Sequence, residues 1–339
     1  MIAEKYFTNS NERLFSYSEI DCETAKALRQ TPGTSLKPFI SSSIKHDPAE
    51  FRDLSTETLT EFFDSPVRFF LRRRLGITVR RGIDEIDDRE AIVPDNLVKF
   101  SIRQQIADCM IKDTDPLPVL KAQGILPHAS LGLAIYDELS SRTKGLVSVV
   151  KGLIGMGSEE SAGFEISSGD YTISGSFELY NGNLVLWRPS DISAKHMMRA
   201  WLWHVLFNLR GKGGITQLAG FKTKDKDKVP AVMRFEPLSN PQSTLDNILG
   251  LFSYGLDRPL HFFPNLSMAY AEGMIKNDED KVIKGLIRDW AGSGFPEGEK
   301  EMDPYYLIYP GEICPIDDNF KWASRLFFGE LLQNSGWEV

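Results

Sequence analysis

Cysteine is scarce in this sequence, and the three cysteines follow no pairing pattern. Cys22, Cys109 and Cys314 lie far apart, and no two of them have the close spacing of a zinc or redox motif. Three scattered thiols give no disulfide framework, and they fall short of the four thiolates that an iron–sulfur cluster normally needs. We therefore expect a reducing compartment and no metal bound through cysteine.

Long apolar runs and an excess of positive charge are also missing. No run reaches the roughly 18 residues of a membrane span, and the N-terminus has no signal-peptide pattern. With 39 Lys and Arg against 47 Asp and Glu, the net charge is −8. A generally basic coat for nucleic acid is excluded, so any contact with nucleic acid must come from a local patch. We expect a cytoplasmic protein that makes no contact with a membrane.

What the chain does contain is typical of a globular protein of 339 residues, with 42% hydrophobic and 25% charged residues. Residues 1–50 are polar, rich in Ser, Thr and Pro, and weakly periodic, with one short helix expected over 21–28. This stretch is typical of an extended arm or a linker from an upstream region. We therefore predict two parts, an arm over 1–50 and a globular domain over 51–339.

A hairpin stands at the centre of the predicted domain. Asn181-Gly182 separates two apolar-patterned runs, 171–179 and 184–188, and such a pair favours a tight turn because both positions need positive φ. A strand over 164–168 precedes the hairpin, and an amphipathic helix over 197–209 and a strand over 215–222 follow it. The order is helix, three antiparallel-leaning strands, helix, strand. It predicts an α/β (α+β) fold with a mixed sheet flanked by helices.

Helices are also expected on both sides of this core. Ser55 or Thr56 is expected to cap one helix, and Ser65-Pro66 to start the next, which Gly76 closes. In a helix over 96–112, Leu97, Phe100, Ile106 and Met110 are expected to face inward. The run over 146–154 is apolar but ambiguous. The remaining expected elements are helices over 129–142, 243–254, 267–275, 278–290 and 320–333, and a strand over 231–235.

The hairpin bears on metal-dependent phosphodiester cleavage, which needs two or more carboxylates around Mg²⁺ and a Lys to stabilise charge or orient water. The core order resembles the restriction-endonuclease-like PD-(D/E)XK superfamily, which supplies these groups from such a hairpin. The resemblance puts Glu178 at the first carboxylate position, Trp187 at the second and Pro189 at the Lys. Gln104 is the nearest counterpart of a metal-binding His on the preceding helix. One carboxylate cannot hold Mg²⁺ catalytically, so the resemblance implies a degenerate site with no catalytic residue and no metal.

Several segments, in order, resemble a more specific family, the C-terminal region of the gamma subunits (RecC) of bacterial exodeoxyribonuclease V. They are FFDSPVRFFLRRRLGI, LVKFSIRQQI, GILPHASLGLAIYDEL, ISGSFELYNGNLVLWRPS, MRFEPL and DRPLHFFP. The resemblance implies a nuclease-like domain without nuclease activity, excised from a longer subunit. It implies the beta and alpha subunits (RecB and RecD) as partners, and a role as scaffold and in strand separation on DNA during double-strand break repair by recombination. It implies no cofactor here, with Mg²⁺ and ATP used by the partner subunits.

Six arginines within fourteen residues form a cationic cluster, at Arg68, Arg72, Arg73, Arg74, Arg80 and Arg81. Guanidinium groups suit bidentate phosphate contact, so Arg68 and Arg72–Arg74 are candidate nucleic-acid-binding residues. Solvated or paired helix arginines are the alternative, with the acidic stretch 84–90 as counter-charge.

Two other functions stay open at this point. One is an active nuclease whose ligands come from Asp170, Glu165 or Glu178. The other is a purely protein-binding module without DNA contact.

Overall fold

A mixed sheet of seven strands organises the described part of the chain. The computed structural model describes residues 18–30, 39–40, 42–79, 94–155, 157, 159–211, 213–223, 228–276, 278–292, 305–310 and 313–338. The strand order is β1-β3-β4-β5-β6-β7, with β2 paired to β3. Pairs β1/β3 and β4/β5 are parallel and the others antiparallel. The strands are β1 (Asp53–Ser55), β2 (Glu159–Ser168), β3 (Tyr171–Tyr180), β4 (Asn183–Ile192), β5 (Thr216–Lys222), β6 (Pro230–Phe235) and β7 (Ser335–Glu338).

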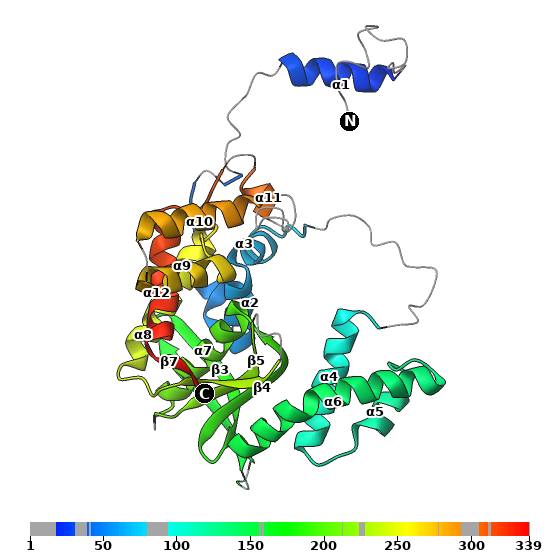
Figure 1. Ribbon diagram of the computed structural model, residues 1–339. Helices are drawn as coiled ribbons and strands as arrows, with labels where there is room; N and C mark the ends of the chain where they lie inside the picture. The colour runs from blue at the N-terminus through cyan, green and yellow to red at the C-terminus, as the bar shows by residue number, and fades with distance from the viewer. Residues whose placement is uncertain are drawn as a thin grey trace.

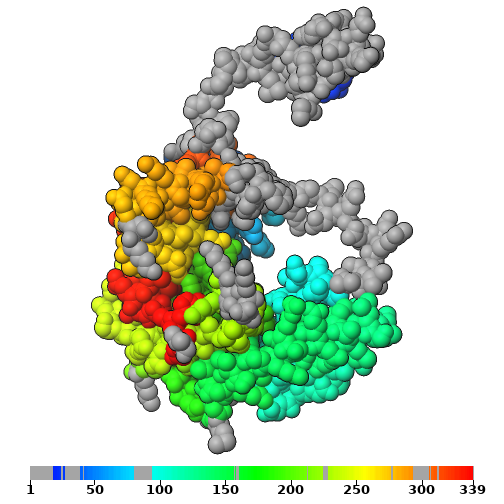
Figure 2. Space-filling model, in the orientation of Figure 1, coloured from blue at the N-terminus to red at the C-terminus, as the bar shows by residue number. Residues whose placement is uncertain are grey.

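Helices cover the two faces of this sheet unequally (Figure 1). Alternating side chains of β5 show the two faces, because Leu218 packs in the large core with α7 while Ala219 and Phe221 pack against α6. The larger layer holds α2 (Thr56–Asp64), α7 (Ala194–Leu209), α8 (Pro241–Asp257), α9 (Pro264–Lys276) and α12 (Asp318–Gln333). Farther from the sheet, α10 (Glu279–Ala291) and α11 (Tyr305–Ile308) pack in a second hydrophobic cluster with α9 and α12. The other group is α4 (Asn96–Ile111), α5 (Pro116–Ala122) and α6 (Ala129–Ile154), which form a lobe on one side of the molecule (Figure 2).

The local signals of the sequence form the predicted elements. Asn181 and Gly182 take φ of 52° and 75°, as the tight turn requires. Ser55 caps α2, with its Oγ accepting from the backbone N–H of Thr58 at 3.2 Å. The predicted α/β fold class is confirmed, and the order α6, β2, β3, β4, α7, β5 is compatible with the nuclease-like core that the resemblance implies.

One prediction about the helices, the inward position of Leu97, was wrong. Leu97 is 76% exposed, because the inward residues of α4 are Ile102 and Ile106, which pack against α5 and α6, and Leu97 lies in the first turn before them. The second predicted helix is the short α3 (Pro66–Phe69), which continues as a π-helical turn over Phe70–Arg74. The ambiguous run at 146–154 belongs to α6. No helix in these described stretches has the length and apolar character of a membrane span.

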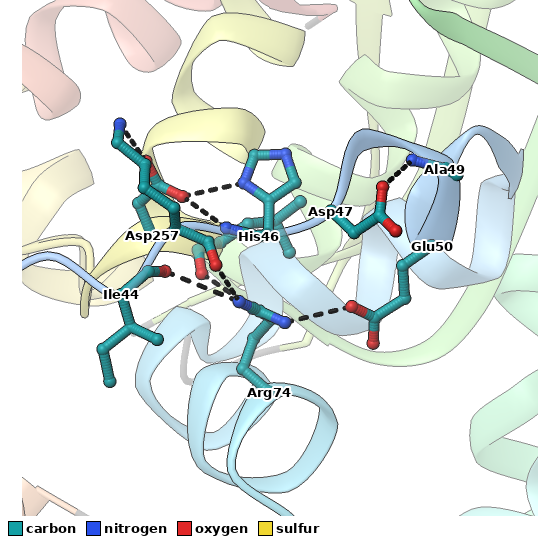
Figure 3. A network of polar contacts seen from close by, with 9 residues as sticks. Ile44, His46, Asp47, Ala49, Glu50, Arg74 and Asp257 are labelled. Carbon is teal, nitrogen blue, oxygen red and sulfur yellow. Dashed lines mark hydrogen bonds and ion pairs between the residues drawn. The ribbon is translucent and has the colours of Figure 1, made fainter.

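Two side chains fasten the last residues of the predicted arm to the domain (Figure 3). The Asp257 carboxylate accepts from Lys45 Nζ at 2.7 Å and from the backbone N–H of His46 at 3.0 Å. The Arg74 guanidinium donates to Glu50 at 3.0 Å and to the backbone carbonyls of Leu256 and Lys45, each at 3.0 Å. The boundary drawn at residue 50 stays a prediction, but residues 44–50 are held against the domain.

Candidate functional site

The two strands of the central hairpin separate soon after their turn. They pair only at Leu179 with Leu184 and Tyr180 with Asn183. Beyond these pairs β4 pairs in parallel with β5. At the other end of β3, residues Thr172–Ser174 pair with β1. On that edge, residues 175–178 of β3 therefore face a gap in the sheet.

A cavity of about 370 Å³ lies at this gap, and we call it the strand-gap cavity. Its walls come from both strands, from α4 and from Trp203 of α7. It brings together three of the four positions predicted for a degenerate metal site, Gln104, Glu178 and Trp187. Pro189 does not line it. The lining residues are Gln104, Asp108, Ser176, Phe177, Glu178, Leu184, Val185, Leu186, Trp187 and Trp203.

Asp108 is the residue of this cavity that sequence reasoning missed. The indole Nε1 of Trp187 donates to Asp108 Oδ1 at 2.9 Å, and the Gln104 side-chain amide donates to the same oxygen at 3.0 Å. Gln104 and Asp108 are four residues apart on α4 and so share one face of the helix. That spacing could have marked Asp108, but its approach to Trp187 depends on how α4 docks against β4.

The arrangement fits a structural contact between α4 and β4 better than a metal site. An indole N–H is a donor only, so Trp187 cannot ligate a cation, and it occupies one oxygen of the nearby acid. Glu178 is exposed, and its side chain makes no hydrogen bond or ion pair with any described residue. Within the described ranges, no group of three or more His, Cys, Asp and Glu side chains could hold a metal ion.

Pro189 lies in an irregular stretch of β4 instead. The register with β5 shifts between Trp187 and Asp191, so that three residues of β4 oppose Gly220 alone. Proline has no N–H for the ladder, which accounts for the interruption at Pro189. A Cβ on Gly220 would lie 3.1 Å from the carbonyl oxygen of Arg188, so glycine permits the close approach.

The irregular stretch also directs Arg188 toward α4. Its guanidinium lies 4.2 Å from the centre of the Phe100 ring, and its Nε donates to Ser190 Oγ at 2.8 Å. Burial, together with the nearby Arg199, lowers the pKa of Arg188. Trp187 and Arg188, neighbours on β4, thus both contact α4.

The predicted nucleic-acid cations differ in what they contact. Arg72 and Arg73 are exposed and lie 3.5 Å and 2.7 Å from Glu61 carboxylate oxygens. Arg74 forms an ion pair with Glu50 and a hydrogen bond with the Leu256 carbonyl, and 10% of its side chain is exposed. Arg68 is exposed, while Arg80 and Arg81 lie outside the described residues. DNA contact by this cluster stays a prediction.

The acids proposed for an active nuclease do not converge. Asp170 lies in the turn before β3, eight residues from Glu178, or about 26 Å along an extended strand. Glu165 pairs with Ser174 of β3, four residues from Glu178, or about 13 Å. Neither reaches the strand-gap cavity.

Comparison with known proteins gives a consistent result. The family model described as the RecC C-terminal domain matches residues 51–274. The chain is 25% identical over 233 residues to the RecBCD enzyme subunit RecC of Escherichia coli (strain K12), covering 67% of this chain and 20% of that protein. It is 24% identical over 271 residues to the RecBCD enzyme subunit RecC of Buchnera aphidicola subsp. Acyrthosiphon pisum (strain APS), covering 75% of this chain and 24% of that one. The chain thus spans about a fifth to a quarter of the length of these relatives.

Proposed function

This chain belongs to the family of RecC C-terminal domains, and from that premise we propose that it is a nuclease-like domain without nuclease activity. It would act within a RecC-type subunit of an exodeoxyribonuclease V helicase–nuclease, in the repair of double-strand breaks by recombination. Its partners would be the beta and alpha subunits, RecB and RecD, for which it serves as scaffold while guiding the separated DNA strands. Mg²⁺ and ATP would be used by those partners and not by this domain.

The hydrogen bond from Trp187 to Asp108 is the observation that carries this proposal. Two carboxylates, Glu178 and Asp108, line the strand-gap cavity, as a metal-dependent nuclease would require. One Asp108 oxygen already accepts from Trp187 and Gln104, and no lysine lines the cavity. The same bond, with the stack of Arg188 on Phe100, holds the α4–α6 lobe against the sheet. We infer that a position used for metal in nucleases serves here to fix a lobe that binds partners.

Digestion of linear duplex DNA by the purified chain in Mg²⁺ tests the absence of activity. We expect no cleavage beyond that of the Glu178→Ala variant. Cleavage that requires Mg²⁺ and disappears in Glu178→Ala would overturn the proposal and restore the active-nuclease alternative.

DNA guidance is assigned to arginine side chains. The exposed Arg68, Arg72 and Arg73 remain the candidates from the sequence. The half-buried Arg103 joins them because its side chain makes no hydrogen bond or ion pair with any described residue. Burial, and then repulsion from Arg142, lowers its pKa, and the opposing attraction of Asp191 is smaller.

Binding of forked DNA by the assembled complex at several salt concentrations tests this assignment. Arg72→Ala combined with Arg73→Ala should weaken binding to all sequences alike. The slope of log affinity against log salt should fall by about 1 for each lost phosphate contact. Arg103→Ala should act in the same way, and Arg288→Ala, an exposed arginine of α10, is the matched control. If neither the Arg72→Ala/Arg73→Ala variant nor Arg103→Ala changed the affinity or the slope, the alternative of a purely protein-binding module would be favoured.

A further inference from the structure

A second cavity, of about 310 Å³, shares no lining residue with the strand-gap cavity. Three separate segments form it: the end of the arm around Ser43, the chain that follows α8 around Arg258 and His261, and the chain before α12 around Tyr309. We call it the arm cavity. Its volume lies at the lower end of the range found for small-molecule sites, about 300–1,000 Å³.

The wall contributed by the arm is held in place by Asp257 (Figure 3). The backbone carbonyl of Asp257 accepts from the N–H of Ile44 at 2.7 Å, while its carboxylate binds Lys45 and His46. Ser43, the residue before Ile44, is thereby fixed beside Arg258, the residue after Asp257. The cavity is therefore a built feature, with walls that a strong polar network positions.

Two residues in the walls of the arm cavity carry buried hydroxyls without partners. Tyr309 is 6% exposed, and its hydroxyl has no hydrogen-bond partner among the described residues. The Ser43 hydroxyl is also buried and unpartnered. Arg258 is exposed at the cavity and makes no hydrogen bond or ion pair with any described residue. An unpartnered buried hydroxyl is destabilising, and such groups call for an explanation in a native structure.

The acid in the same wall is already satisfied. Asp317 accepts from the backbone N–H of Phe320 at 3.0 Å, and His261 Nδ1 lies 3.0 Å from its carboxylate. Burial raises the pKa of Tyr309 well above its usual value, so its hydroxyl stays protonated and able to donate. The groups left free are thus donors and one cation, which match a ligand rich in acceptor oxygens and negatively charged.

The rest of the lining is apolar and aromatic. Ile308 and Ile313 contribute aliphatic surface. Arg258 lies 4.9 Å over the Tyr254 ring, and Tyr254 meets Trp322 edge-on at 5.4 Å between ring centroids. Trp322 lies outside the cavity lining and is 42% exposed. Flat apolar rings beside an unpaired guanidinium are the surroundings that a nucleobase and its phosphate find in nucleic-acid-binding proteins.

We propose that the arm cavity binds a nucleoside phosphate, with the phosphate on Arg258, the sugar and base against the aliphatic wall, and the buried hydroxyls of Tyr309 and Ser43 turning from the wall toward its acceptor oxygens. The same chemistry has two sources, a free nucleotide or the phosphorylated end of a single strand. This site is independent of the function proposed above, because it uses none of the strand-gap residues.

Calorimetric titration of the full chain tests the site with three probes: dAMP, a short single-stranded oligonucleotide with a 5′-phosphate, and the same oligonucleotide without it. Arg258→Gln should raise the Kd by about tenfold or more, since it removes a charged contact with phosphate. Tyr309→Phe should raise it by a smaller factor without lowering the Tm. Arg288→Gln, an exposed arginine on α10, is the matched control and should bind as the wild type does.

The outcomes separate the two sources and can overturn the proposal. Binding of dAMP that both variants weaken indicates a free-nucleotide site. Binding of the phosphorylated oligonucleotide alone, weakened by both variants, indicates a strand end. No binding of any probe up to about 1 mM, or binding that neither variant changes, would overturn the site.

Discussion

The two cavities differ in how their polar groups are satisfied. In the strand-gap cavity, Asp108 accepts from both Trp187 and Gln104, so that the half-buried donors and the acid satisfy one another. In the arm cavity, the hydroxyls of Tyr309 and Ser43 have no partner. A buried polar group without a partner lowers stability unless something binds it.

The difference shows that family position and present chemistry need not coincide. The resemblance to nucleases predicts a metal position at the strand-gap cavity, yet Asp108 there accepts hydrogen bonds from Trp187 and Gln104. The arm cavity has no motif, and part of its lining, from Ile308 onward, lies beyond residues 51–274 that match the family. Its unsatisfied donors are nonetheless the feature expected of a ligand site. The following predictions measure that difference as changes in stability.

The largest effect is expected from Asp257→Asn, which loosens the arm wall. Burial alone would raise the pKa of Asp257, but donors from Lys45 and His46 outweigh it and lower the pKa to about 2. A carboxyl with a lowered folded-state pKa stabilises the fold at neutral pH. Relative to an ordinary value of 3.8, the shift corresponds to about 2 kcal/mol of unfolding free energy at pH 7. Chemical denaturation should show this loss in the variant.

The pH dependence gives the same prediction a second readout. As pH falls from 3.8 toward about 2, the unfolded chain takes up its proton first, so the advantage of the wild type over Asp257→Asn should shrink and vanish. Asp318→Asn, at a side chain that is 99% exposed, is the control and should change stability little at any pH. An Asp257→Asn deficit that persisted below pH 2 would show that the carboxylate charge is not what holds the arm.

Removing the indole donor of the strand-gap cavity should have the next largest effect. Trp187→Phe removes one of the two neutral donors to the half-buried Asp108 and leaves only Gln104, and we expect a loss of about 1–2 kcal/mol in unfolding free energy. Trp203→Phe is a matched control, because Trp203 lines the same cavity and donates to no described residue. A double-mutant cycle with Asp108→Ala isolates the bond. Equal losses in the two Phe variants, or no coupling in the cycle, would contradict the role of the Trp187–Asp108 hydrogen bond in holding α4 against β4.

The sequence predicted features whose signals are local. Asn181-Gly182 set the hairpin and Ser55 the start of α2, because a turn or a cap depends on neighbouring residues. The strands β1 and β7 were missed, since three or four residues are too few to show an alternating pattern.

The sites were less predictable because they depend on contacts between distant segments. Glu178, Trp187 and Gln104 could be placed near one another through the resemblance. Asp108 could not be added, since its bond to Trp187 joins residues 79 positions apart in the chain. The arm cavity joins three segments that no motif links, and its unpartnered hydroxyls become visible only once the chain is folded.

The smallest effect should also have the opposite sign. Tyr309→Phe removes a buried hydroxyl that has no partner, so the unfolding free energy should stay unchanged or rise by less than about 1 kcal/mol. Tyr270→Phe is the matched control, because the Tyr270 ring is equally enclosed but its hydroxyl donates to Glu279 at 2.8 Å, and its loss should lower stability by about 1 kcal/mol. Thermal and chemical denaturation of the two variants, without added nucleotide, measure the contrast. A loss of stability in Tyr309→Phe as large as that in Tyr270→Phe would mean that the Tyr309 hydroxyl is satisfied within the protein. The arm cavity would then be closed in the same way as the strand-gap cavity, because its most buried donor would have no capacity left for a ligand.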